Sequence, residues 1–239
     1  MDPRILVGCP VSDYHEYSTD RYLDAIRKIN YSNYDVLLAD NSKADDFSKK
    51  LQERGINVIR IEHSDAPKKR IIDSRNALRE AVLEKNYDYF LSLEQDVIPP
   101  LDIIKKFISH NKEVVTGIYF NHYPGLNEPI SLAFIETGIK GYGMRTLSDE
   151  ELNSNRLLKI NACGLGCVLI AKEILKKIKF RIDPRFDEFD DMPFCRDIRD
   201  KNIELYADTS VKCIHLLKDR PWSWADLDPP RNILKLKKT

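Results

Sequence analysis

The first hundred residues alternate between short apolar runs and amphipathic stretches, and this alternation constrains the fold more than any other feature. Apolar runs with the length and composition of buried strands stand at 4–10, 35–40, 56–61 and 87–93. Between them, 18–29 and 71–82 have the apolar spacing of helices, and 45–54 is predicted to be a polar helix that Gly55 ends. Strands joined by helices cross over with a right hand, so the pattern predicts an α/β protein with a doubly wound, mostly parallel central sheet.

Polar residues follow each of the predicted strands. They occupy positions 10–13, 40–42, 62–63 and 94–96. Ligands of doubly wound sheets bind beyond the carboxyl ends of the strands. The recurrence of polar and acidic groups at these ends therefore predicts a binding site along that edge of the sheet.

The segment Glu94-Gln95-Asp96 ends the aromatic strand 87–93. Residues i and i+2 of an extended chain face the same side, so Glu94 and Asp96 are able to present oxygens to one point. Mg²⁺ and Mn²⁺ prefer carboxylate oxygens, and Mg²⁺ usually shares its coordination with substrate phosphates. The pair is typical of a metal site for a diphosphate substrate, and a polar strand end at the surface is the simpler alternative.

The second half is less regular, and we expect it to complete a single domain over 1–239. Its predicted elements are helices at 100–110, 171–178 and the end of 183–200, strands at 113–120, 129–135, 203–207 and 211–214, a loop over 136–155, and two short apolar runs within 157–170. These strands predict a smaller mixed sheet on the acceptor side. The nucleotide-binding half would then be 1–100, and the acceptor-binding and catalytic half 101–239.

Composition excludes several classes of protein. Lysine plus arginine and aspartate plus glutamate are equal at 38 each, which gives no sign of nucleic-acid binding. No apolar run approaches the ~18 residues of a membrane span, and the first residues lack the layout of a signal peptide. The scattered cysteines, five in number, are expected to be buried free thiols, which indicates a reducing, cytoplasmic location.

Six elements, taken in order, resemble the family 2 glycosyltransferases of the GT-A fold, which use nucleotide-sugar donors. They are the strand end Pro10-Val11, the turn Asp40-Asn41-Ser42, the helix segment Ser74-Arg75-Asn76-Ala77, the acidic segment Glu94-Gln95-Asp96, the pair Asp190-Asp191, and His215. Two of them depart from the family pattern: Glu94 replaces the first aspartate of an Asp-x-Asp motif, and Asp190 replaces a glutamate. The resemblance covers nearly the whole chain.

The resemblance implies a set of roles for these residues. Donor-binding positions would be Pro10, Val11, Asp40, Ser42, Arg75, Glu94 and Gln95. Two further candidates come from the residues alone: Asp13, at the end of the first strand, and Gly164, whose missing Cβ allows close approach. A Mn²⁺ or Mg²⁺ ion would be held by Asp96 and His215, with Glu94 as a further ligand, and would offset the charge of the departing diphosphate. Asp191 would act as general base on the acceptor hydroxyl, supported by Asp190, with inversion at the anomeric carbon.

Each of these residues also has a simpler interpretation. Arg75 offers a donor fork to phosphate, or forms a structural ion pair. Asp190 and Asp191 suit the first turn of a helix, where carboxylates are favoured. His215 fits a strand end, and the Gly164-Leu165-Gly166 segment is either a close approach to substrate or a plain turn.

The partners that the sequence predicts are a UDP- or GDP-linked sugar and an acceptor of unknown kind, glycan, lipid-linked or protein. Trp222 and Trp224 are candidates for stacking on an acceptor sugar, and equally for closing the core. The basic tail over 231–238 suits an anionic membrane surface, with a solvated terminus as the alternative. Two other functions remain open: a sugar nucleotidyltransferase, whose glycine-rich loop after the first strand is lacking here, and a binding module without catalysis.

Overall fold

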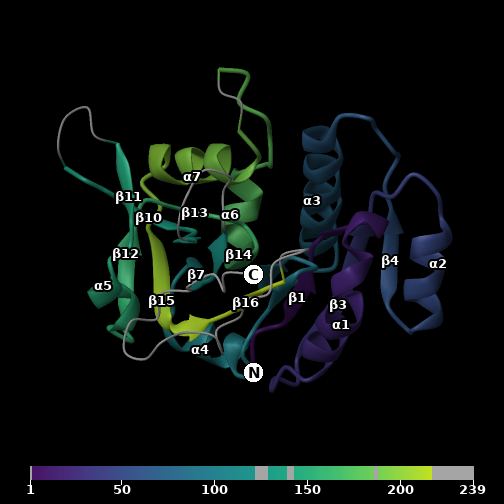
Figure 1. Ribbon diagram of the computed structural model, residues 1–239, viewed down its shortest axis with the longest axis horizontal. Coiled ribbons are helices and arrows are strands. Elements are labelled where there is room, and N and C mark those ends of the chain that lie inside the picture. Colours follow the sequence, from purple (N-terminus) through teal and green to yellow (C-terminus); the bar gives the residue numbers. More distant parts are fainter. Residues whose placement is uncertain (1, 122–128, 139–142, 186–187, 217–239) are drawn as a thin grey trace, which may run out of the picture.

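The computed structural model describes residues 2–121, 129–138, 143–185 and 188–216, and a nine-stranded sheet runs through it (Figure 1). The strands of the first half are parallel and lie in the order β4 (Asn57–Arg60), β3 (Tyr34–Asp40), β1 (Ile5–Gly8), β5 (Tyr89–Leu93). The helices between them are α1 (Thr19–Arg27), α2 (Asp46–Glu53) and α3 (Pro67–Glu84). The predicted doubly wound, mostly parallel sheet is confirmed.

Alternation along the strands sends side chains into two separate cores, one on each face of the sheet. Leu6 and Phe90 pack with α3 and with α6 (Lys172–Lys177) and α7 (Asp191–Asp200). Their neighbours Val7 and Leu91 pack on the opposite face with α1, α2 and α4 (Ile103–Ser109). Because both faces are covered, the central strands β1 and β5 are almost entirely apolar, as expected for a parallel sheet, whereas the edge strand β4 has exposed ends.

The sheet continues into the second half without a break. Strand β14 (Cys167–Ala171) runs antiparallel between β5 and β7 (Val114–Ile118), and β15 (Leu205–Lys212) joins parallel to β7. Strand β12 (Leu157–Ile160) lies antiparallel at the edge. The remaining elements are β2 (Pro10–Val11), η1 (Asp13–Ser18), β6 (Val97–Ile98), β8 (Phe120–Asn121), β9 (Ile130–Ser131), β10 (Ala133–Glu136), β11 (Met144–Thr146), α5 (Asp149–Asn153), β13 (Ala162–Cys163) and β16 (Ile214–His215).

Three expectations for the second half differ from the structure. The predicted loop over 136–155 contains β11 and α5, and α5 begins with a capping box between Ser148 and Glu151. The two strands predicted at 203–207 and 211–214 are largely one strand, β15, which has an irregular register between Asp208 and Lys212. The smaller sheet, β11-β10-β13, is antiparallel rather than mixed.

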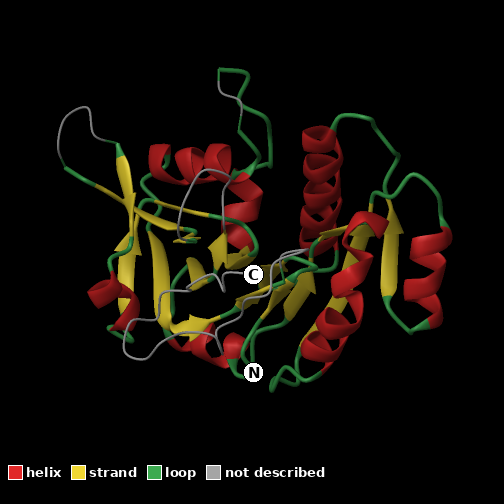
Figure 2. Cartoon of the chain, viewed as in Figure 1, coloured by secondary structure: helices red, strands yellow, loops and turns green. Residues whose placement is uncertain are grey.

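Helix α3 fixes the second half to the first through polar side chains. The Asn76 amide exchanges hydrogen bonds with the backbone of Phe180, at 2.9 and 3.1 Å. Arg79 Nε donates to the carbonyl oxygens of Leu175 and Ile178. Figure 2 shows α3 standing beside the second group of helices and strands. These bonds satisfy carbonyls at the end of α6, which would otherwise lack partners.

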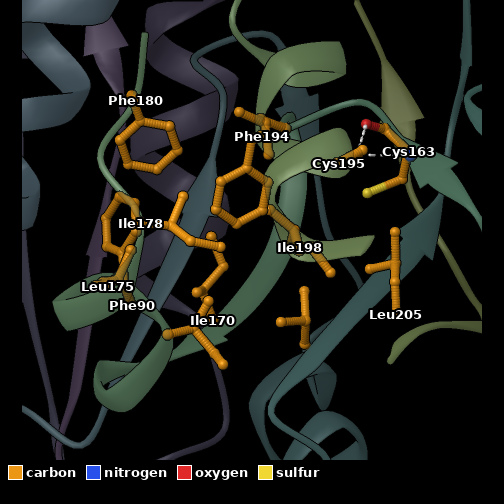
Figure 3. Close-up of a cluster of buried hydrophobic side chains, with 14 of the residues drawn as sticks. Phe90, Cys163, Ile170, Leu175, Ile178, Phe180, Phe194, Cys195, Ile198 and Leu205 are labelled. Atoms are coloured by element: carbon orange, nitrogen blue, oxygen red, sulfur yellow. Dashed lines mark hydrogen bonds between the residues drawn. The ribbon is translucent and has the colours of Figure 1, made fainter. Parts of the chain in front are cut away.

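The core under α6 and α7 is aromatic and aliphatic. Phe180 and Phe194 stack with centroids 5.3 Å apart, and Figure 3 shows Ile178 and Ile198 close to them. The five cysteine side chains are all buried, as expected. Within the described part of the chain, helices long and apolar enough to cross a bilayer are absent. Trp222, Trp224 and the basic tail lie outside the described residues.

Substitution of Gly8 tests how closely strands β1 and β3 approach each other. A Cβ at this position would lie 2.2 Å from the Leu37 carbonyl oxygen of the paired strand β3, a backbone atom that cannot move aside cheaply. We expect Gly8→Ala to lower the free energy of unfolding by about 2 kcal/mol or more, a fall in Tm of roughly 4 °C or more in a chain of this size. Lys49→Ala, at an exposed position of α2, is the control and should stay within about 0.5 kcal/mol. Equal stability of the two variants would contradict the close approach of β1 to β3.

Candidate active site

A cavity of about 480 Å³ opens at the carboxyl ends of β1, β3 and β5. Its lining includes predicted donor-binding and metal-binding residues: Pro10, Val11, Arg75, Glu94, Gln95 and Asp96. Ser12 and Asn41, from the predicted strand ends 10–13 and 40–42, also line it. The lining residues that were not predicted are Tyr14, His15, Pro67, Arg70, Ile71 and Phe189. The structure therefore gathers the strand ends into one site, as parallel strands require.

Other predicted residues stand behind the lining rather than in it. Asp40 is fully buried, and its Oδ1 accepts hydrogen bonds from the amide and hydroxyl of Ser42. Its Oδ2 pairs with Arg60 at 2.5 Å. Ser42 Oγ in turn accepts the backbone amide of Asp13 at 3.0 Å. Asp40 thus supports the turn, and its neighbour Asn41 is the residue of this motif that lines the cavity.

Asp96 and His215 form a pair at the end of β5. Strand β16 pairs antiparallel with β6, which brings His215 Nε2 to 3.3 Å from Asp96 Oδ2. The other ring nitrogen, Nδ1, lies 2.7 Å from the Phe120 carbonyl oxygen and donates to it. This bond leaves Nε2 directed at Asp96, an arrangement common for histidines that bind metals.

Each member of this pair changes the pKa of the other. Burial opposes the charge on Asp96, but His215, with a smaller contribution from His15, outweighs it and holds the pKa of the carboxyl below its usual value. Burial likewise opposes protonation of His215, and Asp96 outweighs it and raises the pKa of the imidazole. The pair therefore favours opposite charges, and a cation is able to replace the proton between them.

The donor atoms of this pair suit Mn²⁺ or Mg²⁺. Neighbouring ligands of an octahedral ion with bonds of about 2.1 Å stand about 3 Å apart, close to the observed separation of Nε2 and Oδ2. Among the described residues there is no group of three or more histidine, cysteine, aspartate or glutamate side chains arranged to hold a metal. Two protein ligands leave coordination positions for phosphate and water, as is common for Mg²⁺.

Glu94 and Asp96 both line the cavity but have different partners. Glu94 Oε1 pairs with Arg75 Nη2 at 2.5 Å, whereas Asp96 pairs with His215. The role of Glu94 as a metal ligand stays a prediction. What the structure shows is that Glu94 neutralises a buried arginine beside the site.

Asp190 and Asp191 begin helix α7. Asp190 is buried and pairs with Arg75 Nε at 2.7 Å. Asp191 is half-buried, and its Oδ1 accepts the amide of Met192 at 2.8 Å. Burial raises the pKa of Asp191 to about 6, assisted by the charges of Asp190 and Glu94 and opposed by the Met192 amide and Arg75. The preceding residue, Phe189, is half-exposed and lines the cavity.

Gln95 holds the segment that follows the first strand. Its side chain accepts the amide of Ser12 and donates to the His15 carbonyl and to Thr19 Oγ1, at 2.9 to 3.1 Å. These bonds bring His15 Nε2 to 3.8 Å from Asp96 Oδ2. The sequence signal for His15 was its position four residues after Val11, close to a strand end already identified as part of the site.

The Gly164-Leu165-Gly166 turn packs against Tyr119. A Cβ on Gly164 would lie 2.2 Å from the Tyr119 hydroxyl, and one on Gly166 would lie 2.8 Å from Glu94 Oε2. Tyr119 Oη accepts the Gly166 amide at 2.9 Å, and its ring stands edge-on to His215. The close approach that these glycines allow is therefore to protein side chains, and Gly164 lies outside the cavity lining among the described residues.

The fold that carries this site is similar to those of several solved structures. No family model and no curated protein matches the sequence. Among solved structures, A197 from STIV is 20% identical, with 99% of this chain and 95% of that one covered and a TM-score of 0.53. GalNAc-T7 with UDP, GalNAc and Mn²⁺ is 13% identical, with 90% and 44% covered and a TM-score of 0.65.

A mannosyltransferase, PcManGT from Pyrobaculum calidifontis, in complex with GDP-Man and Mn²⁺, is 14% identical, with 92% and 59% covered and a TM-score of 0.59. The chain therefore spans about half the length of these two transferases and nearly all of A197. At such low identity the likeness concerns the fold. The chain has the GT-A fold of glycosyltransferases, as the sequence motifs predicted.

The raised pKa of Asp191 has a consequence for stability. A pKa of about 6 in the folded protein, against a usual value of 3.8, means that ionised Asp191 destabilises the fold at neutral pH and that this cost disappears as the pH falls below both values. At 1.36 kcal/mol for each pKa unit the cost is at most about 3 kcal/mol, and partial exposure reduces it. We expect Asp191→Asn to raise the free energy of unfolding by about 1–2 kcal/mol at pH 7 and by almost nothing at pH 4.

Urea unfolding of both proteins at the two pH values measures this difference. Asp200→Asn, at the exposed end of the same helix, is the matched control and should change little at either pH. A loss of stability for Asp191→Asn at pH 7 would contradict a buried carboxylate with a raised pKa.

Proposed function

We propose that the protein is a metal-dependent glycosyltransferase that moves a sugar from a nucleoside-diphosphate donor to an acceptor hydroxyl. The observation that carries this proposal is the Asp96–His215 pair, whose Asp96 lines the cavity of the GT-A fold. Asp191, with its pKa of about 6, follows two residues after Phe189, which also lines that cavity. Two of the structural neighbours contain a sugar nucleotide or nucleotide together with Mn²⁺. Their likeness supports the reaction class.

Asp96 and His215 would hold the Mn²⁺ or Mg²⁺ ion. When bound, such an ion supplies Lewis-acid stabilisation of the charge that develops on the departing diphosphate. The protein's own contribution is orientation. Phe120 fixes the ring of His215, and the pairing of β16 with β6 fixes its distance from Asp96. Preorganised groups of this kind stabilise developing charge without rearrangement during the reaction.

Asp191 is the proposed general base. A carboxylate with a pKa near 6 is ionised at neutral pH and is a stronger proton acceptor than an ordinary aspartate, so it is suited to take the proton of an acceptor hydroxyl. Attack from the side opposite to the leaving diphosphate would invert the anomeric configuration, and inversion is part of the proposal.

The donor would lie along the cavity with its diphosphate towards Asp96. The nucleoside would then meet Pro10, Val11 and Asn41 at the ends of β2 and β3, and UDP and GDP are the two candidate carriers. A cavity of about 480 Å³ is within the usual range for ligands of this size. The acceptor, the stacking roles of Trp222 and Trp224, and a cytoplasmic or membrane-peripheral location stay predictions.

The base assignment is tested by transfer from a panel of UDP- and GDP-sugars in the presence of Mn²⁺. Asp191→Asn should lower kcat by about 10²–10⁴-fold, because it removes the proton acceptor and keeps the size of the side chain. Asp200→Asn, with the same chemical change at the other end of α7, should keep its activity. Full activity of Asp191→Asn would eliminate this residue as the base.

The pH dependence of the same reaction provides a separate test. Because the base acts in its ionised form, kcat should fall tenfold for each pH unit below about 6 and level off above it. Rates measured from pH 4.5 to 8 at saturating donor would show this limb. A rate that does not change across this range would contradict proton transfer to Asp191.

A further inference from the structure

Arg75 is one of the side chains on helix α3 that contact the second half of the protein. The neighbouring side chains Asn76 and Arg79 bind backbone groups of the second half, at Phe180 and at the end of α6. Arg75 instead reaches a side chain, Asp190, at the start of α7. The same helix face thus positions a stretch of the second half that ends at the proposed base.

The guanidinium of Arg75 has all three of its nitrogens engaged. Nη1 donates to Ser92 Oγ at 2.7 Å, Nη2 pairs with Glu94 at 2.5 Å, and Nε lies 2.7 Å from Asp190 Oδ2. The side chain is only 3% exposed although the residue contributes to the cavity wall. Nη1 also reaches the Leu165 carbonyl oxygen at 3.5 Å, so of the five N–H groups of the guanidinium only one, on Nη2, is left without a protein partner for a donor phosphate.

Asp190 depends on Arg75 for charge compensation. Arg75 Nε and Asp190 Oδ2 are both buried, and apart from their 2.7 Å ion pair neither atom has a hydrogen-bond partner among the described residues. Arg75 is also neutralised by Glu94. Asp190 precedes the first residue of α7, and its carboxylate faces Arg75 instead of the backbone amides of the first turn. Buried charges that depend on one partner fix geometry strictly, because separation leaves an uncompensated charge.

We propose that Arg75 is a positioning residue for the base: by holding Asp190 it fixes the first turn of α7 and, with it, the carboxylate of Asp191. The proposal rests on the proposed function, since it assigns Arg75 a role in the step that Asp191 performs. It replaces the donor-binding role that the family resemblance implies for Arg75. The bond from Asp190 to Arg75 would link the base to Glu94 at the end of β5.

Several charged and titratable groups act on Asp191. Asp190 from its own helix start, Glu94 from the end of β5 and Arg75 from α3 affect it most. The buried Tyr119 and Cys163 stand close enough for Asp191 to affect them in turn. Changes at Asp190 and Arg75 therefore have different expected effects, because one alters charge and the other alters geometry.

Asp190→Asn and Arg75→Lys separate these effects. Asp190→Asn removes a negative neighbour, so the acid limb of kcat should move below pH 6 and kcat should fall about tenfold or more with a weaker base. Arg75→Lys keeps the positive charge but lacks the fork that meets Glu94 and Asp190 together, so kcat should fall comparably with the limb near pH 6. The dissociation constant of the Mn²⁺ complex of the nucleoside diphosphate should stay within about threefold in both.

Arg79→Gln is the matched control on the same helix. It removes the hydrogen bonds to Leu175 and Ile178 without touching Asp190, so it should lower stability and leave the pH limb of kcat unchanged. If Arg75→Lys and Asp190→Asn behave as Arg79→Gln does, Arg75 is merely structural and the proposal is overturned. If instead they weaken diphosphate binding by more than tenfold with kcat and limb unchanged, Arg75 is a donor-binding residue, which also overturns it.

A second measurement is independent of transfer activity. Urea unfolding at pH 7 of the single variants Asp190→Asn and Asp191→Asn and of the double variant gives the coupling between the two residues. We expect Asp191→Asn to raise the free energy of unfolding less when Asp190 is already Asn than in the unchanged protein. In a protein that carries Arg75→Lys, we expect the effect of Asp191→Asn to differ as well, because the first turn of α7 has moved. Strictly additive effects, with Arg75→Lys also without influence, would refute the proposal even if no donor is ever found. Absence of transfer with every donor, with coupling intact, would instead refute the proposed function alone.

Discussion

The buried guanidinium of Arg75 joins the two halves of this protein through ion pairs with a carboxylate from each half. It neutralises Glu94 at the end of β5 and Asp190 at the start of α7, with side-chain exposures of 3% for Arg75 and 2% for Asp190. Each of these charges would be costly to bury alone. The position of α7 relative to the first sheet strands, and so the position of Asp191 relative to the cavity, depends on this neutralisation.

The surrounding sheet provides the rigidity that such a network requires. Strand β5 lies between the parallel β1 and the antiparallel β14, so the segment that carries Glu94, Gln95 and Asp96 follows a fully paired strand. Leu91 and Phe90 anchor that strand in the cores on opposite faces. Groups attached to elements of this kind hold their geometry better than groups on free loops.

The sequence predicted the parallel half of the fold well, because apolar runs of strand length and one-sided helices alternate there with clear boundaries. It also identified the strand ends that the cavity joins, since parallel strands end at one edge. Prediction was weaker beyond residue 100. The strand β15 is one element where the sequence predicts two, because its pairing with β7 and β12 is set by distant segments. The helix α5 lies in a predicted loop, although its capping box, Ser148 with Glu151, was a local signal for it.

Side-chain roles were harder to predict than side-chain positions. The sequence placed Asp40 correctly at a strand end. The residues around it give no sign that its carboxylate forms an ion pair with Arg60, twenty residues later. The spacing of Glu94 and Asp96 predicts that both carboxylates face one ligand. The two residues alone give no sign that Glu94 forms an ion pair with Arg75. His15 was missed because only the fold brings it to Asp96, through the hydrogen bonds of Gln95.

The central claim is that Asp96 and His215 bind a nucleoside diphosphate through a divalent cation. Calorimetric titration of UDP and of GDP tests it most directly, with Mn²⁺ or with EDTA, into the protein and into His215→Leu. We expect micromolar binding of one nucleotide that needs Mn²⁺ and weakens at least tenfold in the variant. Binding that is equal with EDTA, or no binding of either nucleotide with Mn²⁺ present, would contradict it.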